Sequence, residues 1–355
     1  MSIKFDVRWR IGAEQALEFE PEFFALLQEI EASGSLFSAA KTLGISYRYA
    51  WGLMREWSGR IGQPVAELHR GRGTKLTPLG AKLLWGQRRV NARLGPELES
   101  LASELNSEIA GMIRSHSHIL VRAYASHGLA IGILRDLLNA RGDLHMELQY
   151  RGSLDSLRLF RSGKCDIAGF HLPYGELGQR LASRYRQLLH PGQDTLIHVV
   201  NREQGIIAAR GNPKGIRAIS DLAGNDIVFV NREPGAGTRL IFDTLLHGEG
   251  IEPSAIRGYD NEEFTHTAVA AMVASGSADA GFGIRAAASR LNLDFISLVR
   301  ERYLFAVRHE ALQSTAITRM RSVLRGRDFR RAVALLPGYD TADSGALVGH
   351  EELFA

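Results

Sequence analysis

Residues 33–54 read SGSLFSAAKTLGISYRYAWGLM and contain two short amphipathic segments on either side of Gly44. Ser35 and Ser46 stand just ahead of the two segments, where a serine can cap a helix. The apolar residues recur at the spacing of one helix face: Leu36, Ala39, Ala40 and Leu43 in the first segment, and Ala50, Leu53, Met54 and Trp57 from the second onward. We therefore predict two helices joined by a tight turn at Gly44.

Two such helices form either a helical hairpin inside a core or a helix-turn-helix that binds DNA. The charge around these helices favours the helix-turn-helix. Residues 41–93 contain eleven basic and two acidic side chains, a net charge of +9, whereas the whole chain has a net charge of +4 and the remainder is therefore −5. A concentrated basic segment favours contact with a phosphate backbone, because binding releases counterions.

A small wing is predicted after the second helix, in residues 67–84, ELHRGRGTKLTPLGAKLL. Two short strands would flank a flexible tip at residues 71–73, and Thr77 and Pro78 would open the next helix. We expect base contacts near the start of the second helix and phosphate contacts from the wing. The predicted DNA-binding residues are Ser46, Tyr47, Arg48, Gly52, Arg55, Arg70, Arg72 and Lys75.

These motifs resemble the winged helix-turn-helix of the molybdate-responsive regulator family, which is related to the LysR-type regulators. The resemblance covers residues 20–85 and rests on SGSLFSAAKTLGISYRYAWGLM and GRGTKLTPLGAKLL. It implies a regulator of transcription that binds double-stranded operator DNA and controls genes for molybdenum supply or for molybdoenzymes.

Leucines continue at helical spacing from Leu79 to Leu105 and predict a long helix, which Gly95 and Pro96 should break or kink. Such a stripe either is buried within its own chain or pairs with a second copy. We favour pairing, and hence a homodimer or a higher oligomer. Three parts are expected: a winged helix-turn-helix DNA-binding domain in residues 1–85, a dimerisation or linker helix in 86–115, and a two-lobed ligand-sensing domain in 116–355.

The length of 355 residues exceeds what a DNA-binding module requires, and 45% hydrophobic with 23% charged residues is an ordinary globular composition. The N-terminus has no apolar signal core, and no run approaches the roughly 18 apolar residues of a membrane span. The single cysteine, Cys165, excludes an internal disulfide. These features predict a cytoplasmic protein with no membrane contact.

From residue 119 onward, strands alternate with helices in two series, which predicts an α/β fold of two lobes joined by crossing strands. The second series includes TLIHVVN and QGIIAAR, and later DFISLV and RYLFAVR, as separate strands. Residues 119–340 resemble the periplasmic-binding-protein fold that cytoplasmic regulators use as a sensor, on segments such as VRAYASHG, FVNREPGAGTRLIFDTLL and AAMVASGSADAGFG. The expected fold thus consists of a winged helix-turn-helix, a long dimerisation helix and a C-terminal two-lobed domain.

Several predicted strands end at loops that open helices, and helix N-termini present unpaired N–H groups to anions. The expected ligand-binding residues are Ser126, His127, Ser153, His171, Arg232, Thr238 and Arg239. This set favours a small oxyanion or carboxylate as effector. The resemblance implies molybdate or tungstate, and the charged groups also fit formate or nitrate. Alternatively, Gly235 and Gly237 serve only a turn and the two arginines are solvated.

No cofactor, metal or catalytic residue is expected, and the chain is predicted not to be an enzyme. GAGTRL has Leu240 where a dinucleotide fingerprint needs its third glycine, and His116 and His118 have no third metal ligand at short spacing. No nucleophile motif stands at a strand-to-helix turn. The alternative function is an anion-handling carrier or enzyme, built on the binding-protein fold with a vestigial winged helix.

Overall fold

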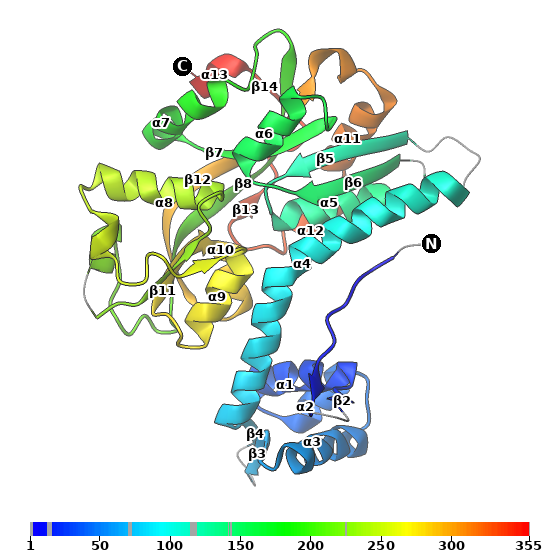
Figure 1. The fold of residues 1–355 in the computed structure, drawn as a ribbon, viewed down its shortest axis with the longest axis vertical. Coiled ribbons are helices and arrows are strands. Elements are labelled where there is room, and N and C mark those ends of the chain that lie inside the picture. Colours follow the sequence, from blue (N-terminus) through cyan, green and yellow to red (C-terminus); the bar gives the residue numbers. More distant parts are fainter. Residues whose placement is uncertain are drawn as a thin grey trace. The chain divides into compact units, whose positions relative to one another are not determined.

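The computed structural model describes residues 3–12, 16–69, 73–113, 119–140, 142, 144–223 and 226–354 (Figure 1). The chain divides into two compact units, one of Asp6–Asn91 and one of Ala92–Ala355 with the N-terminal residues up to Phe5. The division falls inside one long helix, α4 (Pro78–Ile113). Among the described helices, none combines the length and apolar character needed to cross a membrane.

The smaller unit is a winged helix-turn-helix, as predicted. Its elements are β1 (Arg10–Ile11), β2 (Leu17–Glu18), α1 (Pro21–Ser33), α2 (Leu36–Thr42), α3 (Tyr47–Ile61), β3 (Ala66–His69) and β4 (Gly73–Leu76). The two predicted caps form: Ser35 accepts from the Ser38 amide at 3.3 Å, and Ser46 accepts from the Tyr49 amide at 3.1 Å. Between α2 and α3, Gly44 has a φ of +67°, a conformation that glycine adopts at little cost. Strands β3 and β4 pair antiparallel as the wing.

The helix α4 begins as the sequence predicts, since Thr77 accepts from the Gly80 amide at 3.1 Å and Pro78 is the first helical residue. It is not broken at Pro96. A proline leaves the carbonyl four residues earlier without its helical donor. Here that carbonyl, of Ala92, accepts instead from the Thr265 hydroxyl at 2.9 Å, which explains why the helix continues.

The later turns of α4 cover the edge of a sheet. Ser100 accepts from the Tyr150 amide at 3.1 Å, and Ser103 accepts from the Leu148 amide at 2.9 Å. These bonds satisfy backbone groups on the edge strand, which would otherwise be open to pairing with another chain. By contrast, Leu94 and Leu101 of the same helix are exposed.

The described residues of the larger unit form one ten-stranded sheet. The strands are β5 (Ile119–Ala125), β6 (Leu144–Tyr150), β7 (Ile167–Pro173), β8 (Asp194–Ala208), β9 (Phe229–Arg232), β10 (Glu262–Glu263), β11 (Ala280–Ile284), β12 (Asp294–Arg308), β13 (Tyr339–Asp340) and β14 (Leu347–Val348). Their order is β10-β9-β11-β8-β12-β7-β5-β6, with β13 and β14 paired to β8. The helices are α5 (Leu129–Ala140), α6 (Ser153–Arg161), α7 (Gly175–Arg186), α8 (Gly237–Gly248), α9 (His266–Ala274), α10 (Arg285–Arg290), α11 (Thr315–Arg325), α12 (Arg327–Val333) and α13 (His350–Phe354).

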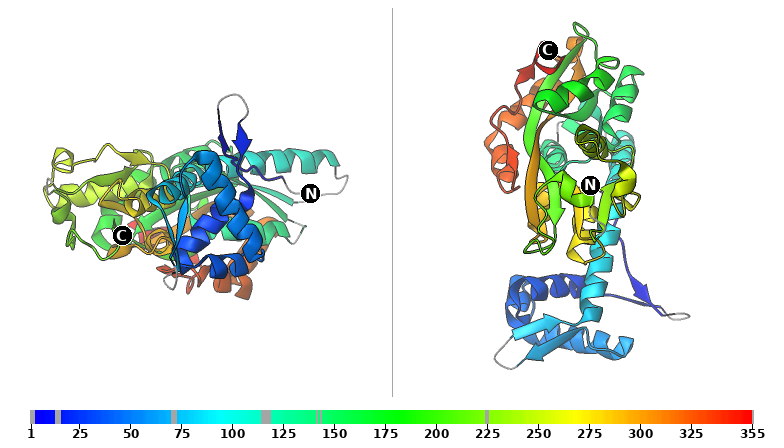
Figure 2. Two further views of the ribbon diagram at one scale, coloured as in Figure 1. Left: turned by 90° about the horizontal axis from the view of Figure 1, so that it is seen from below. Right: turned by 90° about the vertical axis from the view of Figure 1, so that its left-hand side faces the viewer.

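Two lobes share this sheet. The first contains the parallel strands β5, β6 and β7, and the second contains the parallel strands β9, β10 and β11. Strands β8 and β12 are antiparallel to each other and extend through both lobes (Figure 2). Each has 15 residues, so the prediction of separate strands on either side of residues 202–203 and 300–301 is wrong. The polar residues between the predicted strands lie in the middle of continuous strands.

Candidate functional site

The predicted DNA-contacting residues lie on the outer side of α3 and on the wing. Tyr47, Arg48 and Arg55 are exposed, Gly52 is half-buried, and Ser46 is exposed at the helix start. The opposite face packs into the core through buried Ala50, Leu53, Met54 and Trp57. Helix packing thus leaves the polar face of α3 open to solvent.

On the wing, Lys75 is exposed, whereas Arg70 and Arg72 lie outside the described residues. Tyr49 and Trp51, whose rings are exposed on α3, were not among the predicted DNA contacts. The guanidinium of Arg55 lies 5.3 Å from the centre of the Trp51 ring. Tyr49 and Trp51 are 45% and 41% exposed. The sequence signal that could have identified them is that two aromatic residues stand outside the apolar face formed by Ala50, Leu53, Met54 and Trp57.

In the larger unit, His171 is the centre of a buried polar cluster. Its Nδ1 atom lies 3.1 Å from the Ser126 hydroxyl and 3.4 Å from the Ser153 hydroxyl. Ser126 also donates to the Tyr303 hydroxyl at 3.0 Å, and that hydroxyl donates to the Ser126 carbonyl at 2.6 Å. Residues from the ends of β5, β6 and β7 therefore meet as predicted, since parallel strands end at one edge of a sheet.

The second lobe reaches the same cluster through the start of α8. Gly237, the first residue of α8, packs against Nε2 of His171. A Cβ atom built on Gly152 would lie 2.6 Å from the carbonyl oxygen of Gly235. Neither α6 nor α8 has a side-chain cap, so two helix N-termini approach each other with open amide groups. Such termini attract anions.

Three further members of the cluster come from the crossing strands. Glu301 on β12 is fully buried, and its Oε1 atom accepts a short hydrogen bond from Arg202 Nε on β8. The same Oε1 accepts from Gln204 Nε2 at 2.6 Å. The other carboxylate oxygen, Oε2, lies 3.9 Å from His171 Nε2. Arg202 and Glu301 were not predicted because they lie between segments predicted as separate strands, and Gln204 was predicted only as a strand residue.

Many buried polar atoms of this cluster have no hydrogen-bond partner among the described residues. They are His127 Nδ1, His171 Nε2, Arg202 Nη1 and Nη2, Gln204 Oε1, Thr238 Oγ1, His266 Nδ1 and Glu301 Oε2. Leaving one buried polar group unsatisfied costs about 1–3 kcal/mol. Nearly all natural buried polar groups find a partner. This concentration at one place is the arrangement expected of a site that binds a small polar ligand.

The electrostatics of the cluster are dominated by burial and by two arginines. Burial, together with the charges of Arg232 and Arg202, lowers the pKa of His127 to about 3. For His171, burial and the same two arginines outweigh the opposing effect of Glu301 and lower the pKa to about 4. For Glu301, burial alone would raise the pKa, but Arg202 outweighs it and the pKa lies below its ordinary value. The histidines are therefore neutral at neutral pH and Glu301 is charged.

The two predicted arginines differ in position. Arg232 donates from Nε to the Glu263 carbonyl at 3.1 Å and from Nη2 to the Phe264 carbonyl at 2.8 Å. Burial, opposed by Glu233 and assisted by the nearby Arg202, lowers its pKa to about 10. Its charge thus remains and acts on the cluster.

Arg239 does not join the cluster. Its guanidinium bonds to Asp243 at 3.0 Å and to Glu262 at 3.2 Å, and its Nη1 donates to the Arg232 carbonyl at 3.0 Å. Asp243 lies one helical turn later on α8, which positions the carboxylate beside the arginine. Arg239 is therefore a structural residue of the second lobe.

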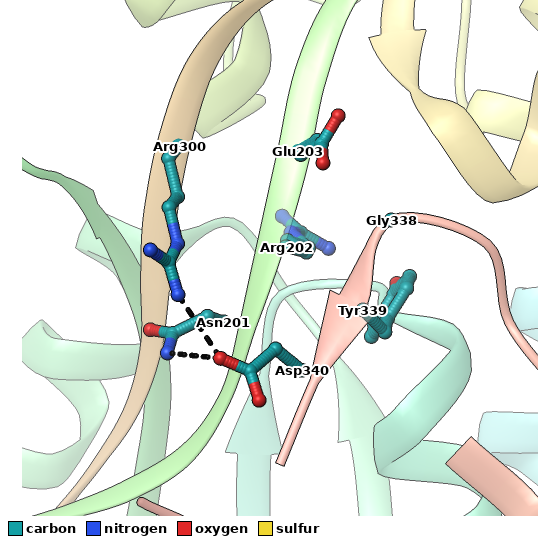
Figure 3. Close-up of a pocket in the computed structure, with 7 residues that line it drawn as sticks. All are labelled: Asn201, Arg202, Glu203, Arg300, Gly338, Tyr339 and Asp340. Atoms are coloured by element: carbon teal, nitrogen blue, oxygen red, sulfur yellow. Dashed lines mark hydrogen bonds and ion pairs between the residues drawn. The ribbon is translucent and has the colours of Figure 1, made fainter. Parts of the chain in front are cut away.

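A pocket of about 340 Å³ lies on β8, β12 and β13 and shares Arg202 with the cluster. It is lined by Asn201, Arg202, Glu203, Arg300, Gly338, Tyr339 and Asp340. Figure 3 shows Asn201 and Arg300 pointing to Asp340, to which Arg300 donates at 3.0 Å. Glu203 accepts from Arg285 at 2.8 Å. Its exposed charges are already paired, and of the predicted ligand-binding residues none lines it.

Comparison with known proteins identifies the larger unit. Residues 135–325, more than half of the chain, match the PBP superfamily domain. The chain is 36% identical over 200 residues to the uncharacterized protein YvgK of Bacillus subtilis (strain 168), which covers 56% of this chain and 64% of YvgK.

A second relative is the molybdenum-pterin-binding protein MopB of Rhodobacter capsulatus, with 31% identity over 112 residues. That match covers 30% of this chain and 38% of MopB, so the chain spans less than two thirds of either relative. A solved structure of a C206 mutant of Corynebacterium glutamicum OxyR matches with a TM-score of 0.45 and 16% identity, over 89% of this chain and 94% of that one.

Proposed function

Because the chain belongs to the PBP superfamily, we propose that it is a transcriptional regulator whose two-lobed unit senses a small oxyanion. In this proposal the winged helix-turn-helix binds double-stranded operator DNA as part of a homodimer, in the cytoplasm. The chain is a sensor and not an enzyme.

The sensor function is supported mainly by one observation: buried donors without partners among the described residues meet near two helix N-termini. His171 Nε2, Thr238 Oγ1 and the Arg202 terminal nitrogens are all buried without partners among the described residues. An anion between the lobes would satisfy them and interact favourably with both helix dipoles. Since these groups come from both lobes, a bound anion would favour lobe closure.

The DNA-binding role rests on the exposed face of α3 and on the concentration of charge. Residues 41–93 have a net charge of +9. Arg48 lies near the start of α3, where a recognition helix contacts base edges. A dimer would set two such helices against successive major grooves, and the exposed Leu94 and Leu101 of α4 supply an apolar surface for pairing.

For the effector, relatedness supports molybdate or tungstate, since the relative MopB is named for binding a molybdenum-pterin. The target genes would then serve molybdenum supply or molybdoenzymes. A small substrate of such enzymes, formate or nitrate, also fits the donor set of the cluster.

Two measurements test this proposal. Calorimetry with molybdate, tungstate, formate, sulfate and phosphate should detect binding of at least one anion. Thr238→Ala should weaken it by about 0.5–1.5 kcal/mol, the usual value of one hydrogen bond. Thr244→Ala is the matched control, because Thr244 is on the same helix and its hydroxyl bonds to the Leu240 carbonyl at 2.7 Å. Heat from none of the anions would refute the sensor.

The second measurement is gel retardation of DNA from the region upstream of the chain's own gene. The regulator should retard this DNA more strongly than random DNA of equal length, and Arg48→Ala should reduce the difference. Anion binding without any DNA retardation would favour the carrier or enzyme alternative instead.

A further inference from the structure

Glu301 presents one hydrogen-bonded and one open oxygen to the buried cluster. Its Oε1 atom accepts from Arg202 and Gln204, whereas Oε2 has no partner among the described residues and the side chain is fully buried. Oε2 lies 3.9 Å from His171 Nε2, beyond hydrogen-bond distance. The cluster therefore contains an acceptor that needs a donor, in addition to the donors that need an acceptor.

The protonation states of the neighbours make this requirement specific. The hydroxyls of Ser126 and Ser153 face His171 Nδ1 at 3.1 and 3.4 Å. In the tautomer in which a serine donates to Nδ1, the proton is on Nε2 and that atom is a donor. Glu301 remains ionised because Arg202 lies against it, and an ionised carboxylate only accepts hydrogen bonds. A ligand in contact with both must accept from His171 and donate to Glu301.

An oxyanion without hydrogen would place a bare, charged oxygen against this carboxylate. Like charges at short range in a buried site repel strongly. An oxyanion that retains a hydroxyl group would instead donate a charge-assisted hydrogen bond, which is among the stronger kinds.

We propose that Glu301 makes the site selective for oxyanions that keep a proton at neutral pH, of which hydrogenphosphate and hydrogenarsenate are the simplest. The hydroxyl of the ligand donates to Glu301 Oε2, and its bare oxygens accept from His171 Nε2, Thr238 Oγ1 and the first amides of α8. This inference rests on the proposed sensor function and deepens it. It also argues against the four effectors named above, because molybdate, tungstate, formate and nitrate carry no proton at neutral pH, and the same holds for sulfate.

Calorimetry at pH 8 with the full chain tests the inference by comparing phosphate with monofluorophosphate. Both are tetrahedral dianions of similar size at this pH, but only hydrogenphosphate has a hydroxyl. We expect phosphate to bind on the order of ten- to a hundredfold more tightly than monofluorophosphate, sulfate or molybdate, the range for one charge-assisted hydrogen bond. This comparison uses the wild-type chain and does not depend on a variant that might misfold.

The variant Glu301→Gln provides the second test, with circular dichroism to verify folding. Its amide can donate to a bare oxygen, so the preference for phosphate over sulfate should disappear or reverse. Glu203→Gln is the control. Glu203 follows Arg202 in the sequence of β8, and its carboxylate pairs with Arg285 instead of the cluster. This control should leave the preference unchanged.

Equal affinity for phosphate and monofluorophosphate, or an unchanged preference in a folded Glu301→Gln variant, would overturn the inference. Tight binding of molybdate with no preference for phosphate would overturn it and leave the sensor function intact. Binding of no oxyanion would overturn both.

Discussion

Closure of the two lobes is tested most sharply at Gly152, the residue that precedes α6 in the first lobe. Its φ of −59° and ψ of 155° suit alanine equally well, so substitution adds no backbone strain. A Cβ atom at this position would lie 2.6 Å from the Gly235 carbonyl oxygen in the second lobe, closer than such atoms approach. The clash therefore exists only when the lobes are together.

Overpacking of this kind costs about 1–3 kcal/mol. If the anion binds between closed lobes, Gly152→Ala should weaken binding by about 5- to 150-fold, because about 1.4 kcal/mol corresponds to a factor of ten. Calorimetric titration of phosphate and molybdate measures this loss.

Gly132→Ala is the control for the first lobe, since a Cβ there would meet its nearest atom at an ordinary 3.6 Å. It should leave the affinity unchanged. An undiminished affinity in a folded Gly152→Ala variant would show that the anion does not require the contact between residues 152 and 235, and would refute the closure argument.

Three further predictions follow from α4, α9 and the buried histidines. Thr265→Val removes the donor to the Ala92 carbonyl in α4, next to His266 of the cluster. It should leave anion affinity within about twofold but reduce the effect of the anion on DNA binding. An unchanged effect would show that the hydrogen bond between Thr265 and Ala92 does not couple the two sites. Leu94 and Leu101 are exposed on α4, and replacing both with glutamate should give monomers in sedimentation and weak operator binding. An unchanged dimer would mean that the interface lies elsewhere. The pKa values of about 3 for His127 and about 4 for His171 lie below the value of about 6.5 expected in the unfolded chain, so unfolding takes up protons at these histidines. The free energy of unfolding should therefore fall by about 1.2 kcal/mol for each histidine as the pH falls from 7 to 5.5. Urea denaturation at both pH values measures this, and His171→Asn should lose one histidine's share of the dependence; equal stability at the two pH values would contradict the assignment of neutral buried histidines.

The winged helix-turn-helix was predictable in detail because its signals are local. Capping serines at positions 35 and 46, a turn glycine and helical periodicity are each set within a few residues. The same applies to Ser126, Ser153 and Thr238, which stand where strands end and helices begin.

The centre of the ligand site was not predictable in this way, because it depends on two strands that lie about a hundred residues apart in the sequence. Arg202 and Glu301 interrupt apolar runs and therefore resemble turn residues, yet each is buried by pairing with the other. One local signal was available: no glycine or proline separates TLIHVVN from QGIIAAR at residues 202–203, as a turn would favour. Arg239 was misplaced for the opposite reason, since its partner Asp243 is local and was overlooked.

An anion in the buried cluster is expected to control operator binding. The most direct test is fluorescence anisotropy of labelled operator DNA with the full chain, with and without saturating phosphate or molybdate at constant ionic strength. An effector can change DNA affinity only through its different affinity for two states, and typical coupling amounts to about 5- to 150-fold. We predict a change in this range for the wild-type chain and a change at least several times smaller for Gly152→Ala at the same anion concentration. Operator affinity that is identical with and without each anion, in a chain that calorimetry shows to bind it, would contradict the account.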